Sequence, residues 1–335
     1  MKILITGGAG YIGSHVVKFL GESCKYEITV VDNLSTGYED SVLYGDFVKK
    51  DLEDFDSVDR LFAEKNFDAV IHLAAATVVP ESVENPLKYY MNNTVNTAYL
   101  IKMCLKYSVK RFVFSSTAAV YGEPEEKEVS EKSELSPVNP YGMSKLMSER
   151  MIKDAGKAHS DFSYIILRYF NVAGADSSGK IGQRFPEATH LIKVACQTAL
   201  GIRDRLEMFG TDFPTKDGTG VRDYIHVNDI AQAHLAVLEK LEKGGKSDIF
   251  NCGYRRGFSV KDIVETVKKV SYTDFKVVKT ERRAGDPSCL IADNSKILRL
   301  TKWSPGFDDI ETICRSAFLW EKKLSRKKTH NFQDS

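Results

Sequence analysis

A short apolar strand, a glycine-rich turn and the start of a helix follow one another at the N-terminus, and no other feature constrains the fold as strongly. Residues 2–6 run directly into Gly7-Gly8-Ala9-Gly10-Tyr11-Ile12-Gly13. Glycines at 7, 10 and 13 permit a tight turn, a close approach of the backbone to a pyrophosphate, and packing of the next helix against the sheet. This order predicts a dinucleotide-binding βαβ unit, and a structural glycine turn without a ligand is the alternative interpretation.

The end of the second strand indicates which dinucleotide binds. An apolar run at 28–31 ends in Asp32, whose carboxylate can grip a ribose diol and repels a 2′-phosphate. Neither Arg nor Lys occurs between Asp32 and Gly37 to neutralise such a phosphate. We therefore expect NAD rather than NADP as the cofactor.

Apolar strands alternate with helical stretches through the first half of the chain, which predicts an α/β fold with a doubly wound parallel sheet. After Phe170 the alternation breaks down, so we expect a second, smaller domain of mixed α/β structure. The dinucleotide domain is expected to span 1–170 with a return segment at about 223–252, and the substrate domain 171–222 and 253–335. The expected strands are 2–6, 27–32, 46–50, 69–73, 111–116, 164–169 and 248–252, the expected helices are 11–21, 55–66, 86–106, 141–159, 187–200, 227–243 and 259–270, and the polar tail 325–335 is expected to fray.

Composition excludes several classes of protein. The chain has 335 residues and 42% hydrophobic content, enough for a large core. Because 47 Lys and Arg balance 46 Asp and Glu, no global basic field favours nucleic acid or an anionic membrane. The six cysteines form no CxxC pair and no metal-ligand cluster with the seven histidines, as in a reduced cytoplasmic protein. We see neither a signal peptide nor an apolar run long enough to span a bilayer, and expect neither export nor membrane insertion.

Tyr141 and Lys145 lie four residues apart where a helix is expected to begin. Asn139 is a suitable N-cap and Pro140 a suitable first helical residue, so both side chains should share one face of the first turns. A phenol is largely ionised near neutral pH only if its pKa falls to about 7, a change of about 4 kcal/mol that a nearby ammonium can largely supply. The pair is therefore a candidate base, and an amphipathic pair on a surface helix is the alternative.

Motifs along nearly the whole chain resemble the extended short-chain dehydrogenases/reductases. These are the glycine loop with Asp32, Leu73-Ala74-Ala75, Phe114-Ser115-Ser116-Thr117, Tyr141-x-x-x-Lys145 and Arg168-Tyr169-Phe170-Asn171. Three later strings are more specific and resemble the UDP-hexose 4-epimerases, including the type that acts on both UDP-Glc and UDP-GlcNAc: YFNVAGA at 169–175, DGTGVRDYIHV at 217–227 and RRAGD at 282–286.

The resemblance implies a catalytic role for three residues. Tyr141 would take the proton of the sugar 4-hydroxyl while C4 passes a hydride to the nicotinamide, and Lys145 would lower the pKa of the tyrosine and hold the nicotinamide ribose. Thr117 would bridge the substrate oxygen and the phenol, although a polar strand terminus is the structural alternative. The 4-keto sugar would then turn over and receive the hydride on its other face, so NAD is regenerated.

The resemblance also implies the cofactor contacts. Asp51 could instead be a strand-end acid and Asn92 an ordinary polar residue of a helix. Thr77 stands where relatives often carry a lysine, which could cost some cofactor affinity. The implied contacts are Gly7, Gly10, Tyr11, Ile12, Gly13, Asp32, Asn33, Asp51, Leu52, Leu73, Ala74, Ala75, Asn92, Ser115, Tyr141, Lys145 and Tyr169.

The implied substrate is a UDP-sugar. Bidentate guanidinium groups suit its diphosphate, although Arg222 next to Asp223 could also form a surface ion pair of little energetic value. His190 falls where relatives often have an asparagine, and we expect an exposed helix residue there; His72 and His226 are expected to pack structurally. The implied substrate contacts are Thr117, Tyr141, Asn171, Phe209, Arg222, Tyr224, Arg283, Asp286 and Leu290.

Leu290 is the position that predicts the range of sugars. By the resemblance it abuts the C2 substituent, where glucose-restricted relatives tend to carry a tyrosine. A leucine leaves room and an apolar wall for an acetamido group, and a register error of one residue would place Cys289 there, which is also small. We therefore predict a 4-epimerase that acts on both UDP-Glc and UDP-GlcNAc. The resemblance further implies a homodimer, for which the helices 86–106 and 141–159 could supply the interface.

Two other functions share parts of this pattern. A sugar-nucleotide 4,6-dehydratase needs an acid and a base that usually follow the Ser/Thr directly, whereas Ala118 and Ala119 follow Thr117. A non-enzymatic dinucleotide sensor on the same scaffold would typically lose the tyrosine or the lysine, and both are present. The 4-epimerase is therefore the favoured prediction.

Overall fold

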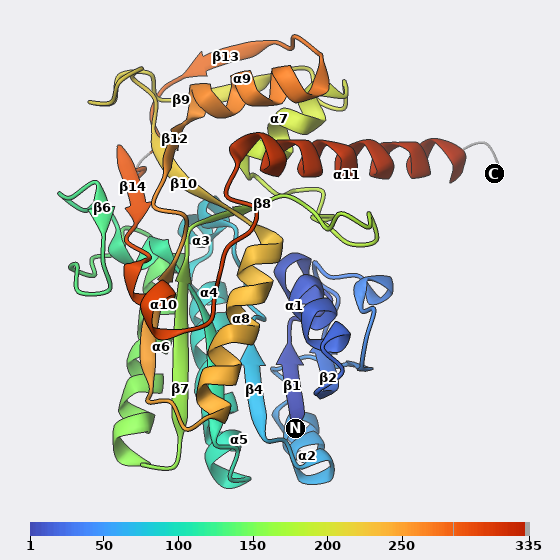
Figure 1. Cartoon of the computed structure of the whole chain (residues 1–335), viewed down its shortest axis with the longest axis vertical. Coiled ribbons are helices and arrows are strands. Elements are labelled where there is room, and N and C mark those ends of the chain that lie inside the picture. The colour runs from blue at the N-terminus through green and yellow to red at the C-terminus, as the bar shows by residue number, and fades with distance from the viewer. Residues whose placement is uncertain (284, 332–335) are drawn as a thin grey trace.

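A seven-stranded parallel sheet forms the centre of the larger part of the molecule (Figure 1). The computed structural model describes residues 1–283 and 285–331. The strand order confirms the predicted α/β class and the doubly wound parallel sheet, because the chain begins near the middle and winds outward in both directions. In spatial order the strands are β11 (Asp248–Cys252), β7 (Ser163–Tyr169), β5 (Arg111–Thr117), β4 (Ala69–His72), β1 (Lys2–Thr6), β2 (Glu27–Asp32) and β3 (Asp46–Lys49).

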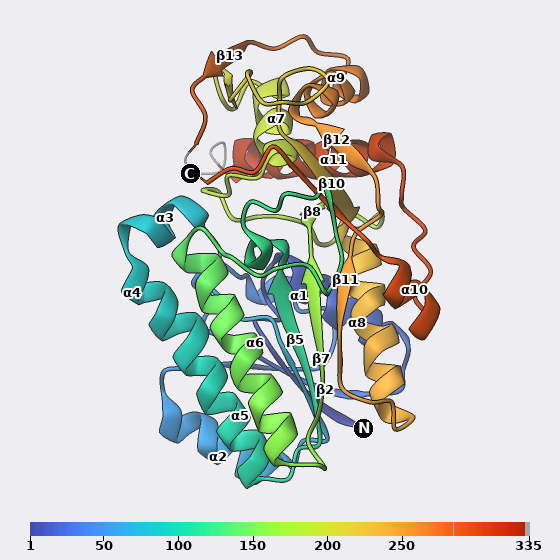
Figure 2. The same ribbon diagram turned by 90° about the vertical axis from the view of Figure 1, so that its left-hand side faces the viewer.

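Helices cover both faces of this sheet, which explains why its central strands are apolar without alternation. In β1, Ile3 and Ile5 belong to the core that includes Val16 of the adjoining helix, whereas Leu4 belongs to a separate core with Phe62 and Leu100. Successive side chains therefore point to opposite, equally buried faces. One face carries α1 (Tyr11–Glu22) and α8 (Val227–Glu242), and the other carries α2 (Phe55–Lys65), α5 (Asn96–Lys106) and α6 (Pro140–Ala158) (Figure 2).

The expected helix at 86–106 is helical but is not a single α-helix. It consists of α4 (Pro86–Tyr89), a π-helical turn labelled η2 (Tyr90–Val95) and α5, and a short α3 (Val79–Glu84) precedes it. The side chain of Asn93, in the π turn, accepts a hydrogen bond from the Ala76 amide at 2.8 Å and donates to the Ala76 carbonyl at 3.0 Å. The widened turn thus presents an amide to the loop after β4, and π turns of this kind often mark functional sites.

The rest of the chain builds a smaller mixed region beside the carboxyl ends of the large sheet. Its helix α7 begins at Leu191 rather than at 187, and its strands were not predicted; three of them, β6, β8 and β12, have only two or three residues. Helix α11, which packs on α7 and α9, continues to Asn331, so residues 325–331 are helical where a frayed tail was expected; residues 332–335 lie outside the described residues. The elements are β6 (Glu128–Val129), β8 (Asn171–Ala173), β9 (Leu206–Phe209), β10 (Val221–His226), β12 (Gly257–Ser259), β13 (Val277–Thr280), β14 (Cys289–Ala292), α7 (Leu191–Ala199), α9 (Val260–Ser271), α10 (Ser295–Leu300), α11 (Ile310–Asn331), and the 3-10 turns η1 (Glu39–Ser41) and η3 (Ala118–Tyr121).

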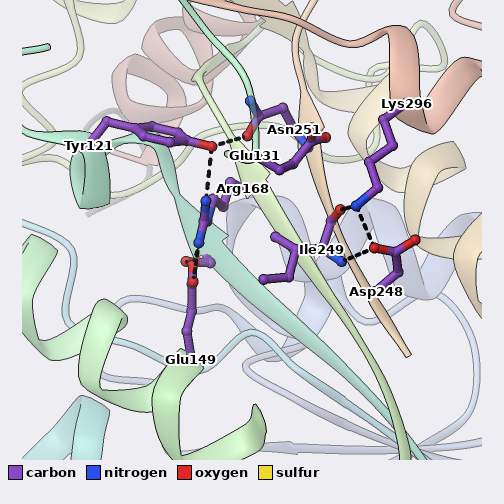
Figure 3. Close-up of polar contacts among 9 residues, drawn as sticks. Tyr121, Glu131, Glu149, Arg168, Asp248, Ile249, Asn251 and Lys296 are labelled. Carbon is purple, nitrogen blue, oxygen red and sulfur yellow. Dashed lines mark hydrogen bonds and ion pairs between the residues drawn. The ribbon is translucent and has the colours of Figure 1, made fainter. Parts of the chain in front are cut away.

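A buried ion pair fastens α6 to the large sheet (Figure 3). Glu149 of α6 accepts hydrogen bonds from Arg168 Nε at 2.9 Å and Nη2 at 2.6 Å, and from Ser116 Oγ at 2.6 Å. The remaining guanidinium nitrogen, Nη1, donates to Tyr121 Oη at 3.0 Å, and that hydroxyl donates to Asn251 Oδ1 at 2.6 Å. The network therefore joins α6 to β5, β7, β11 and η3, with the charges fully removed from water.

A second ion pair, at the first residue of β11, fastens this strand to α10. Lys296 of α10 forms an ion pair with Asp248 at 2.5 Å and donates to the Ile249 carbonyl at 2.9 Å (Figure 3). Strand β11 is thus held by Tyr121 through Asn251 and by α10 through Asp248. Among the described residues, no helix is long and apolar enough to cross a membrane.

We expect removal of one partner of the buried pair to destabilise the protein more than removal of both. Arg168→Met leaves the Glu149 carboxylate buried without its counter-ion, which should lower the free energy of unfolding by about 3–5 kcal/mol. In the double variant Arg168→Met/Glu149→Leu no buried charge is left, so much of this loss should be recovered. Urea unfolding followed by circular dichroism measures both. A double variant no more stable than the single one would contradict this account.

Candidate active site

The predicted site residues meet where the carboxyl ends of the parallel strands lie side by side. The glycine loop follows β1, Leu73 to Ala75 follow β4, Thr117 ends β5, and Asn171 follows β7. Neighbouring strands β4, β5 and β7 are paired in parallel, so these chain ends must lie at one edge. In open α/β sheets this edge is where ligands bind.

Glycine is required in the loop after β1 by direct contact with its neighbours. Gly7 has a φ of +73°, and a Cβ there would lie 2.5 Å from the Ala74 nitrogen. A Cβ on Gly13 would lie 2.0 Å from the Gly7 carbonyl oxygen. Helix α1 then begins at Tyr11, and no side chain caps its N-terminus. The first-turn amides, which include those of Tyr11, Ile12 and Gly13, are therefore suited to an anion such as a pyrophosphate.

Asp32 is held in place by the glycine loop and by its own turn. Its carboxylate accepts hydrogen bonds from the amides of Ala9 at 3.0 Å and Leu34 at 2.8 Å. Burial raises its pKa, and the two amides partly offset that rise. Next to it, Asn33 donates to Asp51 at 2.9 Å, so the two predicted adenosine-side residues are in contact. The uncapped helix, the tight glycine turn and this buried acid fit NAD.

A residue that the sequence analysis missed organises the loop along the expected cofactor path. Asn93 is buried, holds the backbone of Ala76 and donates to Ser144 Oγ at 3.0 Å, while the predicted Asn92 donates to Asn93 at 2.9 Å. Ser144 in turn donates to the Tyr141 carbonyl at 2.8 Å. A chain of hydrogen bonds thus links the loop after β4 to the first turn of α6. The two consecutive asparagines were the available signal, but the sequence does not distinguish which one is buried.

Tyr141 and Lys145 lie one turn apart on α6, as predicted from their spacing, and Thr117 lies next to Tyr141, as the resemblance implied. Asn139 caps α6 by accepting the Gly142 amide at 2.9 Å. A Cβ on Gly142 would lie 2.6 Å from the Ala119 carbonyl oxygen, so this glycine lets α6 approach the turn that follows Thr117. The Thr117 hydroxyl is hydrogen-bonded to the Tyr141 phenol.

The electrostatics of this group differ from the expectation in one respect. Burial raises the pKa of Tyr141, and the hydrogen bond from Thr117 only partly offsets the rise, so the expected lowering by Lys145 is wrong for the protein alone. Burial also lowers the pKa of Lys145 to about 7, against the opposing attraction of Glu149. Lys145 Nζ donates to the Ser115 carbonyl at 2.9 Å and lies 4.8 Å from the centre of the Phe114 ring. The site is too dry for either charged form to be favoured by itself.

Ser115 and Tyr169, both predicted near the cofactor, lie beside this group. The Ser115 hydroxyl is hydrogen-bonded to Tyr169 and lies 3.0 Å from His234 Nε2. Burial raises the pKa of Tyr169, and the neighbouring Tyr141 adds to the rise. Tyr141 and Tyr169 are therefore close enough to influence each other, and the neutral form of each is favoured.

Two of the predicted substrate residues lie on neighbouring strands of the smaller region. Asn171 of β8 pairs with Tyr224 of β10, and both line a cavity together with Tyr11 of the glycine loop. Arg222 does not pair with Asp223 but lies 3.5 Å from Asp286, because Asp223 is buried and accepts several backbone amides.

Two further predicted substrate residues, Arg283 and Leu290, also belong to the smaller region. The exposed Arg283 guanidinium lies 3.7 Å from the centre of the Phe209 ring, a contact suited to an arginine with a free charged edge. Leu290 of β14 is buried in a cluster with Ala118 and Phe170, the residues adjoining Thr117 and Asn171. Leu290 is therefore placed between the predicted catalytic and diphosphate-binding segments.

Of the three histidines singled out in the sequence, His72 and His226 are buried as expected, whereas His190 lies just before a helix rather than within one. His190 is exposed as the N-cap residue of α7. His72 is buried, with its ring nitrogens 2.7 Å from Thr6 Oγ1 and 3.0 Å from Thr97 Oγ1. His226 is buried, stacks on Phe307 at 4.5 Å and has its pKa lowered to about 3, chiefly by burial. Within the described ranges, no group of His, Cys, Asp or Glu could hold a metal ion, and all six cysteines are free.

Comparison with known proteins gives a consistent result. Residues 3–253 match the model of the NAD dependent epimerase/dehydratase family. A UDP-glucose 4-epimerase from Azospirillum brasilense is 48% identical, over 97% of this chain and 93% of that protein. The structure of the UDP-Glc/GlcNAc 4-epimerase from Campylobacter jejuni is similar, with 55% identity, a TM-score of 0.85, and coverage of 96% of this chain and 99% of that one. A UDP-glucose 4-epimerase from Brucella ovis, solved in complex with NAD, has a TM-score of 0.91 at 40% identity and covers 95% of this chain and 97% of that one.

Proposed function

The chain belongs to the NAD dependent epimerase/dehydratase family, within it to the UDP-glucose 4-epimerases, and we propose that it interconverts UDP-glucose with UDP-galactose and UDP-GlcNAc with UDP-GalNAc. The observation that carries the proposal is the hydrogen bond between Thr117, at the carboxyl end of β5, and Tyr141, beside which Lys145 contacts the Ser115 carbonyl. NAD is the cofactor, and a UDP-sugar is the small-molecule partner.

The roles proposed for the residues are those that the family resemblance implies, and their positions are compatible with them. When bound, NAD supplies the acceptor and donor of the C4 hydride and the positive charge of its nicotinamide ring. Tyr141 takes the proton of the sugar 4-hydroxyl, and Thr117 holds the phenol and the substrate oxygen in one line. Lys145, anchored by the Ser115 carbonyl, stabilises the phenolate when its ammonium is charged. Arg222 and Arg283 neutralise the diphosphate, so the sugar can turn over while the nucleotide stays bound.

We further propose the division of labour expected from the sequence. Residues 1–170 with about 223–252 bind the dinucleotide, and 171–222 with 253–335 bind the UDP-sugar. The parallel pairing of β11 with β7 and the packing of α8 on α1 support assigning the return segment to the dinucleotide domain. The free thiols support a reducing compartment such as the cytoplasm.

The leucine at position 290 supports activity toward the N-acetyl sugars. Leu290 lies against Ala118 and Phe170, two side chains at the segments proposed to hold the reacting sugar. A leucine there presents an apolar wall to an acetyl methyl group, whereas a tyrosine would fill that volume. The similar Campylobacter jejuni enzyme is named for both sugars, which supports the same range here.

Exposed apolar side chains on one helical face support a homodimer. Helices α3, α4 and α6 lie side by side with the π turn on the face seen in Figure 2. Their outer surface carries Val83, Leu87, Met91 and Met147, which are 64%, 71%, 55% and 40% exposed. A patch of this kind is typical of a surface that binds another protein, and we propose that a second copy of the chain covers it.

Tyr141→Phe should lower turnover about 10²–10⁴-fold, the usual contribution of a general base. The assay is incubation with UDP-Glc, UDP-GlcNAc and their 4-epimers without added NAD, followed by separation of the products. Bound NAD and the circular dichroism spectrum should be unchanged, and Tyr272→Phe, at a 91% exposed tyrosine, is the control. A wild-type enzyme that accumulates a 4-keto-6-deoxy sugar would show a 4,6-dehydratase instead.

Leu290→Tyr should restrict the enzyme to UDP-Glc and UDP-Gal. The phenol ring would occupy the volume proposed for the acetamido group, so turnover of UDP-GalNAc should fall about 10–200-fold relative to UDP-Gal, as for a misfitting group in a binding pocket. Leu290→Ala is the matched control and should keep both activities. Loss of both activities in the tyrosine variant, at an unchanged melting temperature, would count against a selective role.

Leu87→Lys together with Met91→Lys should convert the dimer to a monomer, because two ammonium groups would have to be buried in the interface. Size-exclusion chromatography with light scattering reports the mass. Leu319→Lys is the control, since Leu319 is 58% exposed on α11, away from this face. A wild-type protein that elutes as a monomer would exclude the dimer.

A further inference from the structure

We propose that Arg184 and Tyr38 form a clasp that retains NAD by closing the adenosine end of its groove. The proposal rests on NAD as the cofactor of the function proposed above, and it concerns how long NAD stays bound rather than the reaction. Arg184 belongs to the smaller region and Tyr38 to the loop after β2. We call residues 174–184, which lead from the substrate strand β8 to this contact, the bridging segment.

The clasp combines stacking with an ion pair. The guanidinium carbon of Arg184 lies 3.8 Å from the centre of the Tyr38 ring, and Nη1 contacts the carboxylate of Asp40 and lies 3.5 Å from Ser41 Oγ. Arg184 is half-buried, with 27% of its side chain exposed, although Asp40 is open to water. A planar guanidinium can make the stacked and paired contacts together, which an ammonium cannot do as well.

The loop that Arg184 grips is part of the dinucleotide site. The Tyr38 amide donates to the Ala9 carbonyl in the glycine loop at 3.0 Å, and the Ala9 amide donates to Asp32 at 3.0 Å. Gly37 packs so closely on Ala9 that a Cβ there would lie 2.9 Å from the Ala9 carbonyl carbon. One residue, Ala9, therefore separates the clasp from the acid proposed to hold the adenosine ribose.

Other contacts fix the bridging segment against the first helix of the dinucleotide unit. Tyr11 donates to the Gly174 carbonyl at 2.6 Å, and Lys18 of α1 forms an ion pair with the buried Asp176 at 3.1 Å. In Figure 1 the segment after β8 lies between α1 and α11. It therefore passes over the start of α1, where the pyrophosphate is expected.

Helix α11 and α7 hold the far side of the segment. Trp320 Nε1 and Lys193 Nζ donate to the Gln183 carbonyl at 3.0 and 3.1 Å, immediately before Arg184. Ser316 Oγ accepts the Ala175 amide at 3.2 Å. Because both ends of the segment are anchored, release of NAD past it requires the Arg184–Tyr38 contact to open.

The test is the rate at which bound NAD leaves the protein in the absence of sugar. Protein purified with its NAD is mixed with excess NADH, and replacement is followed by the fluorescence of the bound NADH. Arg184→Ala should exchange about tenfold faster than the wild type, equivalent to about 1.4 kcal/mol for a partly buried stacked ion pair. Arg184→Lys, which keeps the charge but not the planar stack, should lie between them.

Control variants distinguish loss of the Arg184–Tyr38 contact from a general loss of stability. Tyr38→Ala should accelerate exchange similarly, and the double variant should be no faster than either single one, because the two residues act as one contact. Lys268→Ala removes a cation that pairs with Asp274 at 2.8 Å and lies 5.7 Å from the Phe275 ring, all within the smaller region, and should leave the rate unchanged.

Two results would overturn the proposal: exchange by Arg184→Ala at the wild-type rate, or equal acceleration by Lys268→Ala. Failure of the proposed reaction would be distinguishable, since a wild-type protein that binds NAD but converts no UDP-sugar would still give a valid exchange measurement.

Discussion

The buried pair of Glu149 and Arg168 sets the position of the active helix. Tyr141, Lys145 and Glu149 are four residues apart on α6, so a carboxylate fixed at the third position fixes the other two. Arg168 holds it from β7 and Ser116 from β5, the strand that ends in Thr117. The same charges therefore place the hydroxyl, the phenol and the ammonium relative to one another. The negative charge of Glu149 also opposes the fall in the pKa of Lys145. The Glu149–Arg168 pair therefore contains a charge that acts on Lys145, in addition to fixing the position of α6.

Exclusion of water is the second constraint on this site. Burial raises the pKa of Tyr141, which favours the neutral phenol, and lowers that of Lys145 to about 7, which weakens the preference for the ammonium. A phenol in such a place becomes a base only when positive charge is added next to it, because each charge lowers the cost of the other. The positively charged nicotinamide ring of NAD fits this need. Under the proposed function, Tyr141 would therefore act as a base only with NAD bound, when the hydride acceptor and the proton acceptor are present together.

The large sheet was predictable from the sequence, and the smaller region was not, for physical reasons. Strands such as β1 and β4 are buried on both faces and read as continuous apolar runs, and the glycine loop is fixed by contacts that only glycine permits. In contrast β8 and β12 have three residues each, too few for any periodicity. The end of α11 is polar and reads as a tail, yet it extends a helix whose earlier turns are buried. The contact of Arg184 with Asp40 spans 144 residues, so no local pattern could indicate it.

The spacing of the catalytic residues could be predicted, but their electrostatics could not. A Tyr-x-x-x-Lys pattern gives two groups on one helical face, whereas the pKa of each depends on how much water the fold removes.

The bridging segment could couple binding of the sugar to retention of NAD. It follows β8, whose first residue is the proposed diphosphate contact Asn171. A UDP-sugar that orders Asn171 would also order the segment that we propose retains NAD. Since coupling between two binding sites is reciprocal, bound NAD must then favour the sugar by the same factor. In the proposed reaction, which regenerates NAD in every cycle, this coupling would hold the cofactor more firmly while a UDP-sugar is bound.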